Sequence, residues 1–286
     1  MITIVSMSRR PDLYRDFVKQ AESKMGSLID NYLVFVNDPN FLPFYKNLEA
    51  SSSKVKVYSA PEDFVYKHGH DKVYNFLESK VQSTFILKLF DTDEIVVNSK
   101  LLEEEIKKTN LDIYGMKTWM QRGDVWEVKY QLYRKGVLRW SGLVHENQES
   151  PTGRPMMFWP GPPEITKSTE PSLSGKPDSI HLVPDDGKSP IWIFQGALEN
   201  LKILHHNALD TFSSNLKKTD DGFIILEKTP EGTDSDRRNL LYESLAWRIV
   251  NEDLPHSAKG WFQRHYQINK EVIDWYYDRA KKLYKL

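Results

Sequence analysis

The chain of 286 residues is long enough for one large domain or two small ones with a substantial core. Hydrophobic residues make up 40% and charged residues 28%, which excludes wholesale disorder and a collagen-like or coiled-coil chain. Because 39 Lys and Arg nearly balance 40 Asp and Glu, no strongly basic surface for wrapping nucleic acid is indicated. The absence of Cys excludes disulfides, thiolate metal sites and Cys nucleophiles.

The sequence pattern gives no sign of a membrane span or a signal peptide. Its apolar runs, such as residues 32–36, are far too short to cross a bilayer. The N-terminal residues have no charged region ahead of their apolar stretch, as a signal peptide would. We therefore expect a soluble, cytoplasmic protein with no transmembrane segment.

Strand and helix patterns alternate over the first hundred residues. Apolar runs typical of strands and helical spacings of apolar residues follow one another at residues 2–7, 11–25, 32–36, 41–50, 54–58, 71–81 and 84–89. This order predicts an α/β fold in which helices flank a mostly parallel sheet. Ligands of such sheets bind outside the carboxyl ends of the strands. Polar clusters lie at three of these ends, at residues 6–10, 37–38 and 91–94.

The rest of the chain is less regular. Residues 111–146 contain short aromatic-rich strand patterns, and residues 151–190 hold nine of the 15 prolines. A short helix at 197–201, a strand at 202–206 and two amphipathic helices near 237–250 and 269–286 are expected. The predicted organisation is a catalytic core at 1–150, a Pro-rich irregular segment at 151–190, and residues 191–286. That last part completes the core to about residue 215 and then forms a C-terminal helical extension. The Pro-rich segment is either a lid or acceptor loop or an ordered surface excursion without a role.

One pair of carboxylates stands out by its position. A bare Asp-x-Asp is expected by chance in a chain with 21 Asp, and two occur, Asp91–Asp93 and Asp234–Asp236. Asp91 and Asp93 directly follow a buried strand pattern, whereas the second pair precedes a helix pattern and is better explained by capping. Two carboxylates at a strand end supply the hard oxygen ligands that hold Mg²⁺ or Mn²⁺ on a diphosphate.

Several ordered segments resemble glycosyltransferases of the GT-A fold, and within them the inverting glycosyltransferase family 2. The resemblance covers about residues 1–215. Its segments are VSMSRRPD (5–12), VFVNDPN (34–40), YNFLESKVQSTFILKLFDTDE (74–94), YQLYRKGVLRWSGLVHENQ (130–148) and KILHH (202–206). It implies a Rossmann-like GT-A core that transfers a sugar from a nucleotide-sugar donor to an acceptor hydroxyl. The acceptor stays open among glycans, proteins, lipid-linked molecules and nucleic acids.

The resemblance also implies roles for individual residues. Glu146 occupies the position of the general base, although on residue type alone a surface carboxylate is the simpler interpretation. Asp91, Asp93 and His205 correspond to the ligands of a divalent cation, Mn²⁺ or Mg²⁺, while His205 is otherwise a structural histidine. The residues expected at the substrate and nucleotide are Ser6, Arg9, Asp38, Asp91 and His145. For Arg9 and Arg10, pairing with phosphate and plain surface exposure are both open.

Two other functions are compatible with this sequence. A non-catalytic GT-A-like module would recognise a glycan or a protein through the aromatic middle of the chain. There, Trp119, Trp126 and Trp140 either line an acceptor groove or pack in the core. A nucleotidyltransferase would be expected to have a Gly-rich loop after the first strand, and residues 6–10 contain no Gly.

Overall fold

The computed structural model describes residues 1–8, 10–36, 39–59, 64–120, 124–141, 147–159 and 189–206, with short pieces at 216–218, 224–226, 266–267, 274–275, 277–278 and 281. The chain divides into two compact units. The first, called the sheet unit here, comprises Met1–Ser59, Tyr74–Arg139 and Gln148–Leu209. The second comprises Ala60–Val73, Trp140–Asn147 and Asp210–Leu286. Asp91, Asp93 and His205, and the residues that contact them, belong to the sheet unit.

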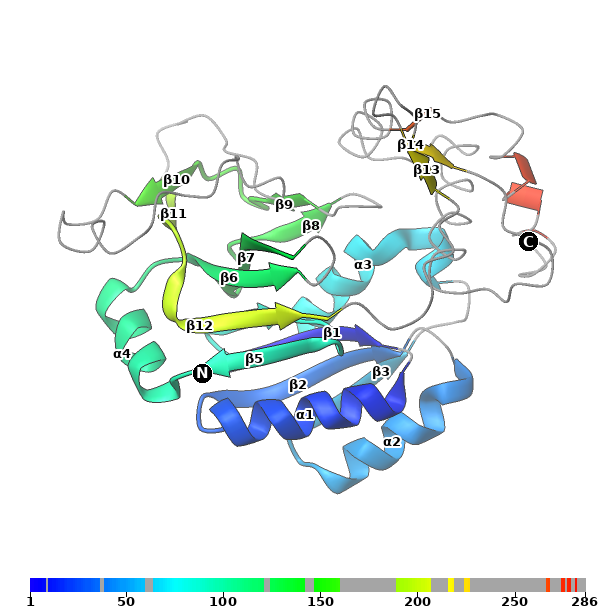
Figure 1. Cartoon of the computed structure of the whole chain (residues 1–286), viewed down its shortest axis with the longest axis horizontal. Coiled ribbons are helices and arrows are strands. Elements are labelled where there is room, and N and C mark those ends of the chain that lie inside the picture. The colour runs from blue at the N-terminus through cyan, green and yellow to red at the C-terminus, as the bar shows by residue number, and fades with distance from the viewer. Residues whose placement is uncertain are drawn as a thin grey trace. The chain divides into compact units, whose positions relative to one another are not determined.

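A ten-stranded sheet forms the centre of the sheet unit (Figure 1). Eight strands are hydrogen-bonded in the order β10-β11-β6-β7-β4-β1-β2-β3, and β12 joins β5 to β6. Six of its nine pairings are parallel, so the predicted mostly parallel α/β fold is confirmed. The strands are β1 (Ile2–Ser8), β2 (Ile29–Val36), β3 (Val55–Ser59), β4 (Phe85–Lys88), β5 (Asp93–Val97), β6 (Ile113–Met120), β7 (Val125–Arg134), β10 (Met156–Trp159), β11 (Ile191–Phe194) and β12 (Leu198–His205). Two further short strands are β8 (Arg139–Ser141) and β9 (Asn147–Glu149).

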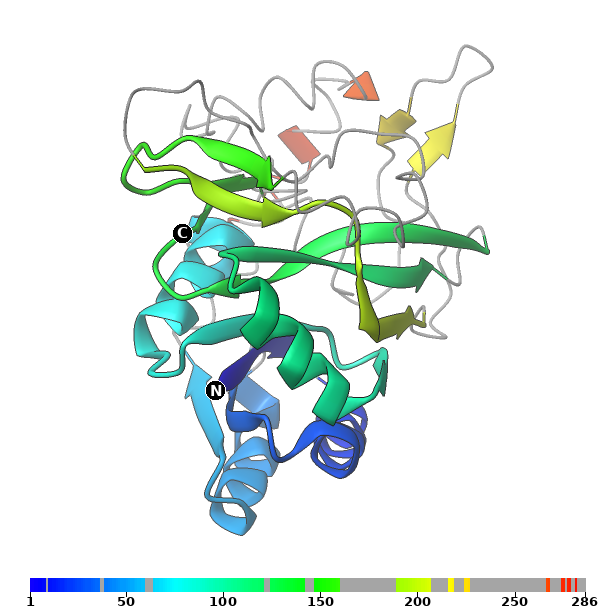
Figure 2. The same ribbon diagram turned by 90° about the vertical axis from the view of Figure 1, so that its left-hand side faces the viewer.

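Helices flank the sheet. Those at residues 11–25 and 42–51, and the second half of the one at 64–80, lie where the apolar spacing predicts them, whereas the helix at 99–109 was not predicted. The helical elements are α1 (Pro11–Met25), η1 (Pro39–Phe41), α2 (Leu42–Ser51), α3 (Phe64–Lys80) and α4 (Ser99–Thr109). Helix α1 lies beside β2 and β5 and α2 lies beside β3 (Figure 1), while α4 lies beside β12 (Figure 2). Pro11 occupies the first turn of α1, where its fixed φ suits the helix and its missing N–H costs no hydrogen bond. The side chain of Asn98 caps α4 by accepting the N–H of Leu101.

The core explains how α1 is held against the sheet. Ile2 and Ile4, which point to one face of β1, are fully buried in the same cluster as Tyr14 and Phe17 of α1. Burying a large apolar side chain of this kind stabilises a fold by about 1.5–3 kcal/mol. The carboxyl end of β1 and the first turn of α1 are therefore fixed next to each other.

The structure differs from the sequence-based expectations in three places. Residues 197–201 are not a helix, because β12 runs through them and pairs with both β5 and β6. The polar residues after β4 are not only a loop, since Asp93 begins strand β5. The Pro-rich segment at 151–190 contains a strand, β10, and its residues 160–188 lie outside the described part.

The second unit is described only in part. It includes a three-stranded sheet of β13 (Leu216–Lys218), β14 (Ile224–Leu226) and β15 (Tyr266–Gln267). Helical residues occur at 274–275, 277–278 and 281 within the helix predicted over 269–286. The helix predicted at 237–250 lies outside the described residues. In the part of the chain that is described, no helix is long and apolar enough to cross a membrane.

Candidate active site

The two carboxylates singled out in the sequence lie in the turn from β4 to β5. The N–H of Asp93 donates to the carbonyl of Phe90 at 3.0 Å, which closes this turn. Oδ2 of Asp93 accepts the N–H of Phe90 at 2.8 Å. The turn thus fixes the orientation of the Asp93 side chain at the first residue of β5.

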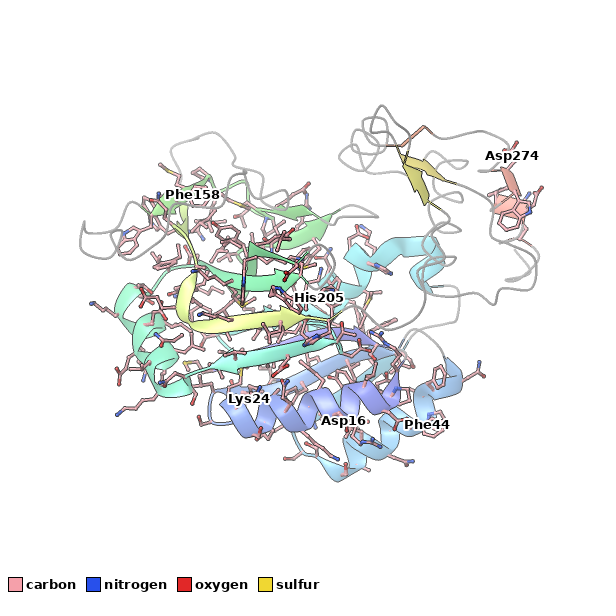
Figure 3. All side chains as sticks on the ribbon, viewed as in Figure 1. Asp16, Lys24, Phe44, Phe158, His205 and Asp274 are labelled. Carbon is pink, nitrogen blue, oxygen red and sulfur yellow. The ribbon has the colours of Figure 1, made fainter. Side chains whose placement is uncertain are left out.

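His205 lies opposite Asp93. Strands β5 and β12 are antiparallel, and their register pairs these two residues. Nδ1 of His205 is 2.6 Å from Oδ1 of Asp93, and the edge of the Phe90 ring contacts the imidazole with centroids 5.5 Å apart. Figure 3 shows His205 at the carboxyl end of β12. The Asp93 side chain is 2% exposed and that of His205 is 21% exposed, so one edge of the imidazole remains accessible.

Asp91 has different partners, which come from β1 and the start of α1. The hydroxyl of Ser8 donates to Oδ2 of Asp91 at 2.5 Å. The guanidinium of Arg10 spans both carboxylate oxygens, with Nε 3.1 Å from Oδ2 and Nη2 bonded to Oδ1. This is the fork geometry that makes Arg–carboxylate pairs directional and strong. Asp91 is therefore held by a bidentate ion pair and a hydroxyl.

Two tyrosines support this network from α1 and α2. The hydroxyl of Tyr45 donates to Ser8 Oγ at 2.6 Å, and the Arg10 N–H donates to the same oxygen at 3.2 Å. Burial, together with the negative charge of Asp91, raises the pKa of both Tyr14 and Tyr45. Both hydroxyls consequently stay protonated and able to donate. Within the described residues, the buried Tyr14 hydroxyl has no hydrogen-bond partner.

A second acid–imidazole contact lies on the other face of the same strands, because side chains alternate along a strand. Nε2 of His206 is 3.4 Å from Oε2 of Glu94, and Nζ of Lys24 is 3.3 Å from Oε1 of Glu94. The indole of Trp119 meets His206 edge-on with centroids 5.9 Å apart, and its Nε1 donates to Asp124 at 2.8 Å. This face is polar and aromatic.

The structure brings together only part of the set of predicted site residues. Asp91, Asp93 and His205 lie in the sheet unit at the ends of β4 and β12. Ser6 is fully buried in β1, and its hydroxyl has no partner among the described residues. Arg9, Asp38, His145 and Glu146 lie outside the described residues.

Sequence reasoning missed the partners of Asp91. Ser8 and Arg10 belong to the polar cluster at residues 6–10, so the end of the first strand was a usable signal. Tyr45 gives no such signal, because an apolar-faced helix contains many tyrosines that only pack. Trp140 is buried and Trp126 is 40% exposed, so the three tryptophans proposed for an acceptor groove do not share one environment.

Asp93 and His205 could supply two ligands on one side of a divalent-cation site. Ligand atoms about 2.1 Å from an octahedral Mg²⁺ and at right angles stand about 3 Å apart, so Nδ1 of His205 and Oδ1 of Asp93 would have to give up their 2.6 Å hydrogen bond and separate slightly. Both oxygens of Asp91 are engaged by Arg10 and Ser8. Among the residues that the structure describes, no three His, Asp or Glu side chains are grouped to hold a metal. The protein therefore offers a partial donor set, the kind that phosphates and water complete.

Comparison with known proteins gives fold similarities of low coverage. No protein-family profile and no curated protein sequence matches the chain. Residues 1–349 of TarS from S. aureus align with a TM-score of 0.32 at 14% identity over 42% of this chain and 35% of that chain. TarS has also been solved with UDP-GlcNAc and with UDP. The 4-diphosphocytidyl-2C-methyl-D-erythritol synthase from Anaerococcus prevotii aligns with a TM-score of 0.35 at 10% identity over 47% of this chain and 70% of that chain. The mannosyltransferase Ktr4p from S. cerevisiae aligns with a TM-score of 0.29 at 11% identity over 41% of this chain and 38% of that chain.

Proposed function

We propose that this chain is a metal-dependent, inverting glycosyltransferase with a GT-A-like core similar to family 2, which uses a nucleotide-sugar donor. The observation that supports the proposal most is the contact of Asp93 with His205 at the carboxyl end of a mostly parallel sheet. That edge is where α/β sheets bind ligands. Asp91 lies in the same turn as Asp93, next to the arginine that follows β1.

The chemistry of the reaction suits these groups. Negative charge builds on the diphosphate as a nucleoside diphosphate leaves a sugar, and a bound Mn²⁺ or Mg²⁺ offsets this charge without any proton transfer. In the proposal, Asp93 and His205 hold the ion, with Asp91 as a further ligand. Both carboxylates are buried within a turn whose backbone is hydrogen-bonded, which keeps them oriented.

The remaining roles follow the resemblance. Glu146 is the proposed general base, which takes the proton of the acceptor hydroxyl during in-line displacement. Ser6, Arg9, Asp38 and His145 are the proposed contacts to the nucleotide and phosphates. On the hairpin of β6 and β7, the exposed Trp126 offers an aromatic face of the kind that stacks on a sugar ring.

The proposal is tested by thermal unfolding with a matched set of ligands. UDP, GDP and CDP should each be tried with Mn²⁺ and with EDTA, and uridine should be the control that lacks phosphate. We expect at least one diphosphate to raise the unfolding temperature only with the metal, and uridine to have no effect. The matching nucleotide-sugars should then be hydrolysed slowly. Absence of any diphosphate effect would refute the proposal, and binding without hydrolysis or transfer would favour the non-catalytic module.

A further inference from the structure

We infer that Arg10 is a positioning residue that occupies Asp91 until a donor diphosphate is present. In this inference the guanidinium competes with the divalent cation for Asp91 and is passed to the phosphates when the donor binds. The inference rests on the proposed function and adds to it the order in which cation and donor enter. Arg10 would thus exchange one anionic partner, the carboxylate of Asp91, for another, the diphosphate of the donor.

Both carboxylate oxygens of Asp91 are already engaged by other side chains. Arg10 takes both oxygens, and Ser8 donates a third hydrogen bond to one of them. The side chain of Asp91 is 1% exposed, so water has almost no access to it. A cation can reach these oxygens only after the guanidinium has moved. Arg10 and a metal ion are therefore alternative partners of Asp91.

Arg10 occupies an unfavourable place in the fold for a cation. It is the residue that caps the N-terminus of α1, and its side chain makes no capping hydrogen bond. The partial positive charge of a helix N-terminus disfavours a cation and favours an anion. The guanidinium thus depends on a neighbouring anion, and Asp91 supplies it. A phosphate group can likewise present two oxygens to a guanidinium fork, and a diphosphate carries more negative charge than a carboxylate.

The guanidinium of Arg10 also has room to leave Asp91. The Arg10 side chain is 24% exposed, whereas its partner is almost fully buried. Asp91 stays where it is after Arg10 leaves, because the Ser8 hydroxyl still holds it and the Tyr45 hydroxyl holds Ser8. Exchange therefore requires a rotation of one exposed side chain and no movement of the strands.

The test measures cation binding and diphosphate binding separately in three proteins. Arg10→Gln removes the competing charge. Arg15→Gln is the matched control, because Arg15 lies on the same helix and pairs with Asp12 on the exposed surface. Free Mn²⁺ is followed by electron paramagnetic resonance in a titration without nucleotide, and binding of UDP at saturating Mn²⁺ is followed by calorimetry.

The two affinities should change in opposite directions. Without nucleotide, Arg10→Gln should bind Mn²⁺ at least about tenfold more tightly than the wild type, a difference of ~1.4 kcal/mol. At saturating Mn²⁺ it should bind UDP about tenfold more weakly, because a phosphate contact is lost. Arg15→Gln should match the wild type in both. A purely structural ion pair would lower the unfolding temperature without this opposite pair of changes.

Further variants keep the inference open to refutation. If Arg10→Gln does not fold, Arg10→Lys keeps the charge but loses the fork, and it should show both changes in weaker form. Asp91→Asn in the Arg10→Gln background should remove the gain in Mn²⁺ affinity. If the wild type binds UDP with Mn²⁺ but Arg10→Gln gains no Mn²⁺ affinity, the inference is wrong and the proposed function stands. If no protein binds Mn²⁺ or any of the three diphosphates UDP, GDP and CDP, both are wrong.

Discussion

At the scale of single residues, Asp93 has two separate interactions that a substitution can distinguish. Its Oδ2 accepts a backbone N–H within the turn, and its Oδ1 faces the imidazole of His205. Asp93→Asn keeps the shape and can keep the turn hydrogen bond but loses the charged ligand. We expect metal-dependent turnover to fall by more than tenfold, a loss above ~1.4 kcal/mol in activation free energy.

The control for this change is Asp12→Asn, which alters an exposed carboxylate on α1. It should leave turnover unchanged and should lower the free energy of unfolding by no more than about 1 kcal/mol, because Asp12 lies in the first turn of α1 and pairs with Arg15. Turnover is measured with Mn²⁺ at saturating donor, and the fold is checked by urea unfolding. More than a tenth of the activity remaining in Asp93→Asn would remove Asp93 from the metal site.

Glu146→Gln tests the proposed base. Loss of a general base slows the chemical step by about 10²–10⁴-fold. Donor affinity should barely change, because the base acts on the acceptor. The dissociation constant of the donor and the turnover number are measured together. Unchanged turnover would make Glu146 a surface carboxylate, and a parallel loss of binding and turnover would place it next to the metal or His145.

Tyr14 and Tyr45 should respond differently to loss of the hydroxyl. Tyr45 donates to Ser8, so Tyr45→Phe should lower the free energy of unfolding by about 1 kcal/mol. The Tyr14 hydroxyl has no partner among the described residues, so Tyr14→Phe should leave stability equal or higher, since burial of an unbonded hydroxyl is unfavourable. Urea unfolding at pH 7 compares the two variants. Equal losses would show that Tyr14 has a bonded partner.

Residue type and position predicted that Asp91 and Asp93 lie together at a strand end, because both directly follow the same apolar strand pattern. The carboxyl ends of parallel strands meet at one edge of a sheet, which is where a ligand is expected. The partner of each carboxylate could not be predicted in the same way. The contact of Arg10 with Asp91 depends on the rotamer of the Arg10 side chain, and the contribution of Tyr45 depends on how α2 packs. Contacts of this kind produce no periodic spacing of residues from which a sequence analysis could predict them.

At the scale of secondary structure elements, Gly115 lets strand β6 approach the carbonyl of Gly196 and the side chain of Val128 closely. A Cβ at this position would meet the carbonyl oxygen of Gly196 and would lie 2.7 Å from Cγ1 of Val128. Strand β6 pairs with β12, which carries His205. Gly115→Ala should therefore destabilise the protein by about 1–3 kcal/mol through overpacking, and it should weaken diphosphate binding as well.

Gly136→Ala is the contrasting variant. A Cβ at Gly136 has nothing within 4 Å, and the position has φ +82°, which favours glycine. The expected loss is about 1 kcal/mol from backbone strain alone, without an effect on diphosphate binding. Urea unfolding and calorimetry measure both quantities. An equal effect of the two changes on binding would refute the packing role of Gly115.

Most elements with strong local patterns were predicted, although the amphipathic helix α4 was missed, and elements defined by pairing were not predicted. Helix α1 follows from Pro11 and its apolar spacing. Residues 197–201 are mostly good helix formers, yet residues 198–201 belong to strand β12. The hydrogen-bonded pairing of β12 with β5 and β6 outweighs a helix propensity of a few tenths of a kcal/mol per residue. Strand β5 was not predicted either, because it is defined by pairing with a distant segment: its only partner among the described strands is β12.

At the scale of the whole molecule, buried tyrosines should make stability fall at high pH. Burial is the largest cause that raises the pKa of Tyr14, Tyr32, Tyr45 and Tyr114. The native state then keeps protons that the unfolded state releases above about pH 10, the ordinary pKa of tyrosine. This stability is fully present below pH 10 and is lost as the pH rises above it, by ~1.4 kcal/mol per pH unit for each tyrosine.

Urea unfolding between pH 9 and pH 11 measures this slope. Tyr14→Phe should reduce the decrease in the free energy of unfolding above pH 10 by ~1.4 kcal/mol per pH unit. At pH 7 the free energy of unfolding of this variant should be equal to that of the wild type or higher. A slope that does not change would show that the Tyr14 hydroxyl ionises equally in the native and unfolded states.

The pairing of β5 with β12 also sets when the site can form during synthesis. Asp93 and His205 are 112 residues apart, so at roughly 5–20 residues per second a ribosome adds His205 about 6–22 s after Asp93. During this interval β5 has no strand to pair with among those described, and its polar edge is open to other chains. A nascent chain halted before residue 198 should therefore be prone to aggregate and to recruit chaperones, whereas one extended past residue 205 and clear of the ribosome should not.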